Sequence, residues 1–550
     1  MGIRRQNVQM GKNLFQKIGR NSEEKSTLKK SVILLHQVNL MSESPKSIAQ
    51  HYHERTKYDP ETLGLKSQTL DWEKQPIPFK EYKIGTVFDL KPYLRDTDET
   101  PSSDPKIRLW QRLSHLLLHS YGLTAKLPTM AGVHYLRAAP SAGGLYPAEI
   151  YLISRGTAIL PAGLYHYQAQ THGLVQFWEN QVWPDLRDAC FWHPALENTH
   201  LALVTTAVFL RSSWRYQDRA YRRICLDTGH LLGNIELMAA MNDYRPHLIG
   251  GFADDILNQL LYLDTNAEGA IAVLALADLL QIEENLPLLR TALPSVTNID
   301  YPNIPDGKLL DYLHESTKIE TDSSGTQGWK LLETDEILED KYNFPFCTKI
   351  STVTSSIDWG KNLSGLEKTL LKRRSTRNYN GAELMLNELL ALLDFTYQPY
   401  HYIHQGLDGS PDYFDLSLIE TFIAVSGVSG LEDGCYYYAP KAQELRQIRF
   451  KNFRKELYYL CLQQDLGRDA SAVLFHTADL KKAIANYGDR VYRYLHLDAG
   501  HLGQRLNLGA FYLRLGVSGI GGFFDDQVNE VLGIPADEAV LYITTLGRPK

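Results

Sequence analysis

The chain has 550 residues, of which 44% are hydrophobic and 22% charged, and its formal net charge is -7. This length exceeds what one ordinary hydrophobic core holds and predicts roughly two to four domains. The composition is typical of a soluble globular protein. The acidic balance argues against a nucleic-acid partner, and no apolar run reaches the roughly 18–20 residues that span a bilayer, so no membrane partner is expected either.

The first 40 residues differ in charge from the rest of the chain, with eight Lys or Arg and only two Glu. A targeting segment would be basic in the same way, but no signal-peptide core with a cleavage site is present. We expect residues 1–40 to form a disordered extension, with translation beginning at Met41 as the alternative. Residues 41–95 are then an N-terminal leader segment.

The five cysteines are scattered and form no CxxC pair. This spacing indicates neither a zinc site nor a disulfide framework, and it is typical of a reducing cytoplasm. His230 and His501 each lie in a Gly-His-Leu motif, and no second His or carboxylate stands at ligand spacing from them. We expect both to be helix-core histidines and predict no metal site.

From residue 96 onward the hydrophobic pattern alternates between helical and extended periods. It predicts an apolar helix over residues 109–123 and strands over 149–154, 163–167 and 270–276. A long buried helix is predicted ahead of the last strand by apolar positions at helical spacing, namely Leu226, His230, Leu231, Ile235 and Met238.

The same series of elements occurs twice. The segment DRAYRRICLDTGHL (residues 218–231) recurs as DRVYRYLHLDAGHL (residues 489–502), 271 residues further on. The same offset carries Gly250-Gly251-Phe252 onto Gly521-Gly522-Phe523. We therefore predict two copies of one α+β domain, over residues 96–285 and 361–550, with a linker over 286–360. Two such copies in one chain predict an intramolecular pseudo-twofold dimer, so that a monomer acts as a dimer.

The two copies differ at a segment whose basic side chains could bind an anionic ligand. The second copy carries four closely spaced polar residues ahead of its helix at residues 386–397, and these are Arg373, Arg374, Ser375 and Arg377. Planar guanidinium groups beside a hydroxyl suit a phosphate monoester. The first copy has TDETPSSDPK (residues 97–106) at the corresponding place, without arginine.

A glycine-containing loop shows the opposite difference. The first copy has a small-residue loop consisting of Pro140, Ser141, Ala142, Gly143 and Gly144, whereas the second copy has PDYFD at residues 411–415. Glycines let the backbone approach a ligand closely, and bulky aromatics beside two carboxylates would obstruct an anion. Each copy thus keeps the half that the other has lost, which predicts one complete site per chain.

The ordered set RRSxR, PSAGGLYP, GLYHY, YRxxxLxxGHL, GGF and LGRP resembles the nitroreductase superfamily of flavoproteins, most closely its SagB-type dehydrogenase branch in a tandem form. The resemblance covers roughly residues 50–290 and 365–550. It implies that FMN binds between the two domains and that hydride is transferred through flavin N5 by a ping-pong mechanism.

The resemblance also implies roles for individual residues. It assigns Arg373, Arg374, Ser375 and Arg377 to the FMN phosphate and ring edge, and Arg548 to the phosphate as the family's C-terminal basic residue. It assigns Pro140, Ser141, Ala142, Gly143 and Gly144 to a loop that reaches the isoalloxazine from the other subunit. Gly521 and Gly522 match positions whose backbone N–H groups face the flavin N5 and O4 region.

Tyr216 is the candidate catalytic residue. The azoline oxidases of the SagB-type branch have a Lys-Tyr pair that is thought to act in proton removal, and here the matching residues are Arg215 and Tyr216. Arginine stays protonated and is a poor base, so azoline oxidation is in question. Tyr216 as a packed helix-start aromatic is the alternative role.

The leading hypothesis is an FMN-dependent oxidoreductase that acts on a small-molecule or peptide substrate, with NAD(P)H as a candidate reductant. A non-catalytic flavin-binding or scaffold protein is the alternative from another class, and an azoline-type peptide dehydrogenase is a third possibility. The complementary half-sites favour the enzyme, because random decay need not leave two halves that complete each other.

Overall fold

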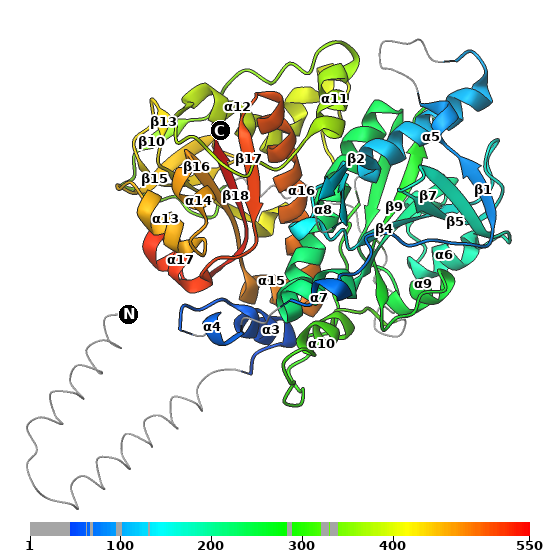
Figure 1. Cartoon of the computed structure of the whole chain (residues 1–550), viewed down its shortest axis with the longest axis horizontal. Helices are drawn as coiled ribbons and strands as arrows, with labels where there is room; N and C mark the ends of the chain where they lie inside the picture. Colours follow the sequence, from blue (N-terminus) through cyan, green and yellow to red (C-terminus); the bar gives the residue numbers. More distant parts are fainter. Residues whose placement is uncertain are drawn as a thin grey trace, which may run out of the picture. The chain divides into compact units, whose positions relative to one another are not determined.

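Two seven-stranded sheets form the framework of the protein in the computed structural model (Figure 1). The structure describes residues 45–61, 63–66, 70–94, 102–129, 132–282, 289–320, 329 and 339–550. The extension predicted for residues 1–40 lies outside the described residues. Residues 47–550 form one compact unit, and no helix in the described part is both long and apolar enough to cross a bilayer.

The first sheet is antiparallel throughout, and its central strands are buried on both faces, which is why they read as continuous apolar runs. Its strands follow the spatial order β1 (Thr86–Asp89), β6 (Gly173–Trp178), β5 (Gly163–Gln168), β4 (Ala148–Ser154), β7 (Leu201–Val208), β9 (Glu268–Asp278) and β8 (Tyr244–Ile249).

The second sheet repeats the first, position by position. Its order is β10 (Lys349–Ser351), β15 (Glu444–Arg449), β14 (Gly434–Ala439), β12 (Glu420–Val425), β16 (Ala472–Asp479), β18 (Glu538–Gly547) and β17 (Gly516–Ile520). Even the irregularities recur, because the register shift at Thr205/Thr206 in β7 returns at His476/Thr477 in β16. The predicted tandem α+β fold is confirmed.

The predicted helices are present as well. Residues 109–123 fall mostly in α5 (Pro105–Tyr121), and residues 386–397 form α12 (Leu386–Tyr397). The long buried helices are α8 (Ala220–Met241) and its counterpart α16 (Val491–Tyr512), which pack against each other between the two sheets (Figure 1). The shorter helices include α6 (Trp183–Ala189), α7 (Phe209–Tyr216), α9 (Asp254–Leu260), α13 (Arg454–Leu460), α15 (Leu480–Tyr487) and α17 (Asp525–Leu532).

Buried ion pairs join the two domains with pseudo-twofold symmetry. Arg222 of α8 pairs with Asp525 of α17 at 2.7 Å, and Arg493 of α16 pairs with Asp254 of α9 at 2.8 Å. Both arginines and both aspartates are related by the offset of 271 residues. Burial raises the pKa of Asp525, but Arg219 and Arg222 outweigh it and leave the carboxyl ionised with a lowered pKa. A paired charge of this kind tolerates burial that an isolated charge would not.

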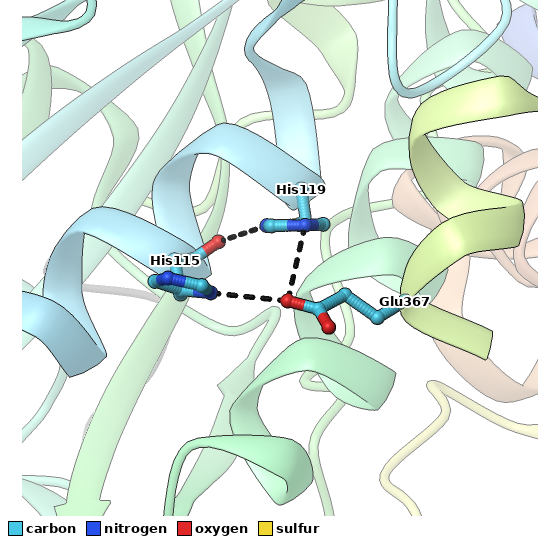
Figure 2. A group of neighbouring side chains, drawn as sticks. All are labelled: His115, His119 and Glu367. Atoms are coloured by element: carbon cyan, nitrogen blue, oxygen red, sulfur yellow. Dashed lines mark hydrogen bonds and ion pairs between the residues drawn. The ribbon is translucent and has the colours of Figure 1, made fainter. Parts of the chain in front are cut away.

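A third contact between the domains involves two histidines of α5 and one glutamate of α11 (Ser364–Lys372). Figure 2 shows the rings of His115 and His119 beside the Glu367 carboxylate. Glu367 Oε1 lies 3.2 Å from His115 Nδ1 and 3.5 Å from His119 Nε2. All three side chains are buried, and α11 ends directly before Arg373.

The segment between the two domains contains a second copy of the leader. The helix α3 (Ile48–Thr56) and the helix α10 (Leu309–Ser316) make equivalent contacts: the Thr56 carbonyl accepts from Arg219, and the Thr317 carbonyl accepts from Arg490. The strands β1 and β10 likewise take the same edge position in their sheets. The described residues 289–320 and 339–360 therefore include elements equivalent to those of the leader, in a segment that the sequence predicted as a linker.

Candidate functional site

The small-residue loop at residues 140–144 is fastened to α8 by one buried aspartate. Ser141 Oγ donates to Asp227 Oδ2 at 2.6 Å, and the Ala142 amide donates to the same carboxylate at 3.1 Å. The backbone then turns through Gly143 and Gly144 with φ values of 67° and 68°, in the left-handed region that favours glycine. The loop is thus held in a conformation that a bulkier residue would strain.

Burial raises the pKa of the Asp227 carboxyl to about 7, although the hydrogen bonds from Ser141 and Ala142 work in the opposite direction. Asp498, its counterpart in α16, holds the second copy's loop through the amides of Phe414 and Asp415 and has its pKa raised to about 7 for the same reason. The anchoring of the loop is therefore common to both copies, and only the loop differs.

A chain of contacts leads from this loop to the second domain. The Tyr216 hydroxyl lies 2.9 Å from the position that a Cβ on Gly143 would take. The Arg223 guanidinium lies 3.9 Å from the centroid of the Tyr216 ring, and Arg223 Nη2 donates to the Gly521 carbonyl at 3.0 Å. The structure thereby brings together three sets of predicted residues: the loop, Tyr216 and the Gly521-Gly522 pair.

The arginine-containing segment approaches the same loop from the second domain. Arg373 is buried, and its Nε donates to the carbonyl of Ala138 at 3.1 Å, two residues before Pro140. Burial and the neighbouring Arg374 lower the pKa of Arg373 to about 10, against the influence of the Tyr146 and Tyr542 phenols. Ser375 Oγ lies within 3.5 Å of Arg373 Nη1.

The other arginines of this segment have no acidic partner within the described residues. Arg374 donates only to the backbone carbonyls of Leu371 and Arg373, and Arg377 is exposed. Guanidinium groups without carboxylates are available to an anion. Arg548 is placed differently, because its guanidinium pairs with Glu388 at 2.7 Å, while its backbone carbonyl accepts from Asn380 at 3.0 Å. Its predicted role at a phosphate stays a prediction.

Arg223 is the residue that the sequence comparison missed. It is 5% exposed, and its Nη1 forms no hydrogen bond with any described residue. The signal was available, because the first copy has YRR at residues 221–223 where the second has YRY at 492–494. An orphaned buried guanidinium N–H beside a glycine loop indicates an anionic or electron-rich ligand.

His230 lies behind this arrangement and is bonded within the core, as predicted. Its Nδ1 and Nε2 contact Gln504 Oε1 and the Tyr542 hydroxyl, each at 2.9 Å. Burial lowers the pKa of His230 to about 3, so the ring is neutral. The ring therefore positions Tyr542 and carries no charge to a ligand.

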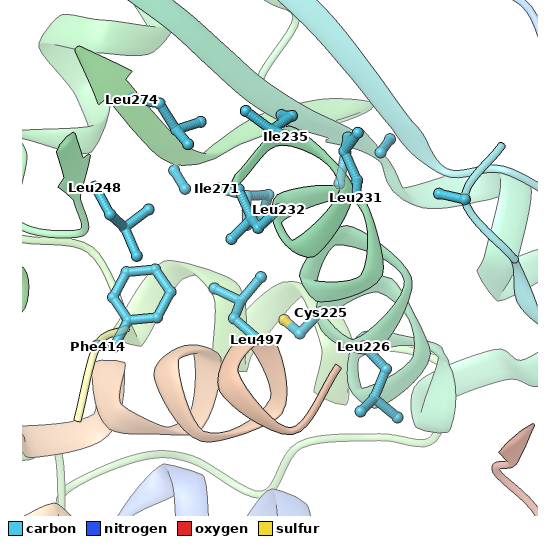
Figure 3. Close-up of a cluster of buried hydrophobic side chains, with 14 of the residues drawn as sticks. Cys225, Leu226, Leu231, Leu232, Ile235, Leu248, Ile271, Leu274, Phe414 and Leu497 are labelled. Carbon is cyan, nitrogen blue, oxygen red and sulfur yellow. The ribbon is translucent and has the colours of Figure 1, made fainter. Parts of the chain in front are cut away.

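The mirror position is the equivalent place in the other half of the chain, at residues 411–415 and Gly250. Side chains of the protein itself fill it. Phe414 lies in the apolar cluster around α8 and α16, next to Leu248 and Leu497 (Figure 3), and its ring stacks on Tyr494 at 4.7 Å. Tyr413 stacks on His501 at 4.3 Å. These rings stand where the first copy has glycine and alanine, so the loop packs as core.

The backbone of the mirror position is occupied as well. The Gly250 amide donates to the Thr291 carbonyl at 2.7 Å, and Leu293 packs against Gly251. Gly521, the counterpart of Gly250, forms no hydrogen bond through its amide to any residue that the structure describes. The two halves of the chain are therefore unequal: one presents free donors and the other has satisfied them internally.

The comparison with known proteins agrees with this architecture. The model of the nitroreductase family matches the chain twice, over residues 116–277 and 370–548. A crystal structure of a nitroreductase-like protein from Anabaena variabilis is 69% identical, covers 92% of this chain and 100% of that one, and superposes with a TM-score of 0.87.

Two curated relatives each match one stretch of the chain. The nitroreductase-like protein MJ1384 of Methanocaldococcus jannaschii is 33% identical over 183 residues, which are 33% of this chain and 90% of that protein. The microcin B17-processing protein McbC of Escherichia coli is 27% identical over 142 residues, which are 25% of this chain and 52% of McbC. The match thus spans about half of McbC.

Proposed function

The chain belongs to the nitroreductase family and is an oxidoreductase, and on this basis we propose that it works through FMN held at one site between its two domains. The observation that carries the proposal is the continuous set of contacts from Gly143 through Tyr216 and Arg223 to Gly521. FMN, when bound, supplies a two-electron centre that accepts hydride from a donor and passes it to an acceptor.

The arginine segment would hold the phosphate. Arg374 and Arg377 have no carboxylate partner within the described residues, and Arg373 is already fixed by Ala138. Hydrogen bonds between charged groups contribute about 1.5–3 kcal/mol each, so two or three of them are enough to hold a phosphate monoester firmly. Arg548 joins this set only if its guanidinium leaves Glu388.

The loop, Arg223 and Gly521 would border the ring. The Arg223 guanidinium and the Gly521 amide are donors in a fixed place, and fixed donors favour the build-up of negative charge beside them. The left-handed glycines let the loop backbone come close. Tyr216 can hold or release a proton at its hydroxyl, next to Gly143, whereas Arg215 cannot act as a base.

The substrate is proposed at the level of its class only. A small molecule is the first candidate, with NAD(P)H as the candidate donor. The likeness to McbC favours a peptide as the second candidate, in azoline-type dehydrogenation. The Arg215-Tyr216 pair in place of Lys-Tyr argues against that chemistry. A scaffold role is disfavoured because one half of the chain keeps hydrogen-bond donors, the Arg223 guanidinium and the Gly521 amide, that are available to a ligand.

The amount of FMN per chain tests the proposal. We expect the purified protein to be yellow and to release one FMN per chain on denaturation. Two FMN per chain would contradict the single site, and a protein that neither contains nor binds FMN would overturn the cofactor assignment. Stopped-flow reduction with NADH, NADPH and other hydride donors then identifies the donor by the rate at which flavin absorbance is lost.

A further inference from the structure

The cluster of His115, His119 and Glu367 plays no part in the proposed flavin chemistry, yet its geometry is specific (Figure 2). The two histidines stand four residues apart on one face of α5, and their rings are stacked at 5.3 Å. The glutamate comes from α11 of the other domain. The three ligand atoms lie within 4.8 Å of one another, and all three residues are buried.

The hydrogen bond on one side of the His119 ring fixes what the other side presents. His119 Nδ1 contacts the His115 carbonyl at 2.9 Å, and a carbonyl can only accept, so this nitrogen carries a proton. A neutral ring then has its lone pair on Nε2. That atom is buried without a hydrogen-bond partner among the described residues and faces Glu367 Oε1 at 3.5 Å. Two electron-pair donors facing each other in a dry interior require a positive charge between them, either a proton or a metal ion.

Two of the donor–donor distances agree with a tetrahedral zinc site. In a tetrahedral zinc site with Zn–N and Zn–O bonds of about 2.0–2.1 Å, neighbouring ligand atoms stand about 3.3–3.4 Å apart. The separations from Glu367 Oε1 to the two imidazole nitrogens are 3.2 and 3.5 Å. Two imidazoles and a carboxylate form a donor set that zinc accepts, with water as the fourth ligand.

We propose that His115, His119 and Glu367 bind one Zn²⁺ ion that fastens the first domain to the second. The ion would join α5 to α11, and α11 leads directly into Arg373, whose Nε reaches Ala138. The metal would therefore hold the arginine segment against the glycine loop. Its role is structural, because no hydrogen bond among the described residues joins α5 or the cluster to Tyr216, Arg223 or Gly521.

The metal content of the full-length, tag-free protein tests this proposal directly. We expect mass spectrometry of protein purified without chelators to give about one zinc per chain. His119→Gln and Glu367→Gln should each weaken zinc binding at least tenfold, measured by competition with a chromophoric chelator. No zinc in the wild-type protein, together with no Zn²⁺ uptake in a titration of the metal-free protein, would overturn the proposal.

His496→Gln is the matched control. His496 is buried in α16, its Nδ1 contacts the Tyr492 carbonyl at 2.9 Å, and its Nε2 has no hydrogen-bond partner among the described residues, as for His119. No described carboxylate pairs with it. Zinc content should be unchanged in this variant. If all three variants keep their zinc, the metal lies elsewhere and the cluster is a His–Glu ion pair only.

The thermal midpoint of unfolding gives a second readout that does not depend on measuring the zinc content. A strong chelator should lower the midpoint of the wild-type protein, and added Zn²⁺ should restore it, because a ligand bound only by the folded state stabilises that state. The His119→Gln variant should respond to neither. A chelator effect of equal size in wild type and variant would contradict zinc at this cluster.

Discussion

Gly229 and Gly500 lie against each other where α8 crosses α16. A Cβ built on Gly229 would stand 2.9 Å from the Gly500 Cα and would overlap the Leu497 carbonyl, and a Cβ on Gly500 would overlap the Leu226 carbonyl. The two glycines are equivalent residues of the two copies, 271 positions apart. Because the same residue of each copy meets its counterpart, the pseudo-twofold axis of the protein runs through this contact.

Gly229→Ala should therefore destabilise the protein. The added methyl group meets backbone rather than a movable side chain, so the two helices must separate, and overpacking of this kind costs about 1–3 kcal/mol. Urea unfolding measures the change. Gly64→Ala is the control, because a Cβ at Gly64 would meet nothing within 4 Å. Equal stability of both variants would show that the crossing adapts freely.

Arg374→Ala should weaken FMN binding by roughly 10- to 150-fold, which corresponds to one lost charged hydrogen bond of about 1.5–3 kcal/mol. Equilibrium dialysis or fluorescence titration measures the dissociation constant. The control is Tyr413→Phe in the mirror half, where the ring stacks on His501 and the hydroxyl forms no hydrogen bond within the described residues. Weakening by Tyr413→Phe instead would move the site to the other half.

Tyr216→Phe separates catalysis from packing. The variant keeps the ring under Arg223, so FMN should stay bound, while loss of a proton donor should slow one half-reaction by about 10²-fold or more. Stopped-flow kinetics of the two half-reactions measures this. Tyr487 is the equivalent residue of the second copy, and its hydroxyl bonds Asp415. Tyr487→Phe should leave both rates unchanged, and the same result for Tyr216→Phe would make that tyrosine a packing residue.

Asp227→Asn should change how stability depends on pH. The folded-state pKa of Asp227 is raised to about 7, against about 3.9 in an unfolded chain. The folded protein therefore binds the proton more tightly, so the stability that Asp227 contributes is complete below about pH 4 and is lost as the pH rises through about 7. The stability of the variant relative to the wild type should therefore increase as the pH rises from about 4 to about 7.

Thermal unfolding of both proteins across that pH range checks this sign. Asp498→Asn should show the same difference, because burial raises the pKa of Asp498 to about 7 as well, but it should leave FMN binding unaffected. A wild-type protein that gains stability relative to Asp227→Asn on going to alkaline pH would contradict a raised pKa.

The constant offset in the sequence was enough to predict the duplication, while the hydrophobic periodicity predicted the α+β class. Residues that recur at an offset of 271 positions must occupy equivalent places, so two equal domains and a symmetric pairing followed from the recurrence of DRAYRR as DRVYRY and of Gly250-Gly251-Phe252 as Gly521-Gly522-Phe523. The second leader was missed for the same reason. HERTKY at residues 53–58 returns as HESTKI at 314–319 with an offset of 261, which a search at one fixed offset passes over.

Contacts between residues distant in the sequence could not be predicted from the sequence. Nothing in the sequence says that Thr291 reaches Gly250, because the path of a segment without periodicity depends on the packing around it. The pairing of Asp254 with Arg490 and Arg493 has the same origin. Arg223 is a different case. It aligns with Tyr494 at the offset of 271 residues, so the sequence alone showed that the two copies differ at this position.

The rings of Tyr413 and Phe414 in the mirror position have a consequence for how such a protein can change over time. In a dimer of identical chains, every substitution appears twice, so a mutation that fills one ligand position fills both. Fusion of the two copies removes that constraint. One position could be given over to the packing of Phe414, Tyr494 and Thr291 while the other kept its donors. Duplication thus freed half of the inherited binding surface to serve as core.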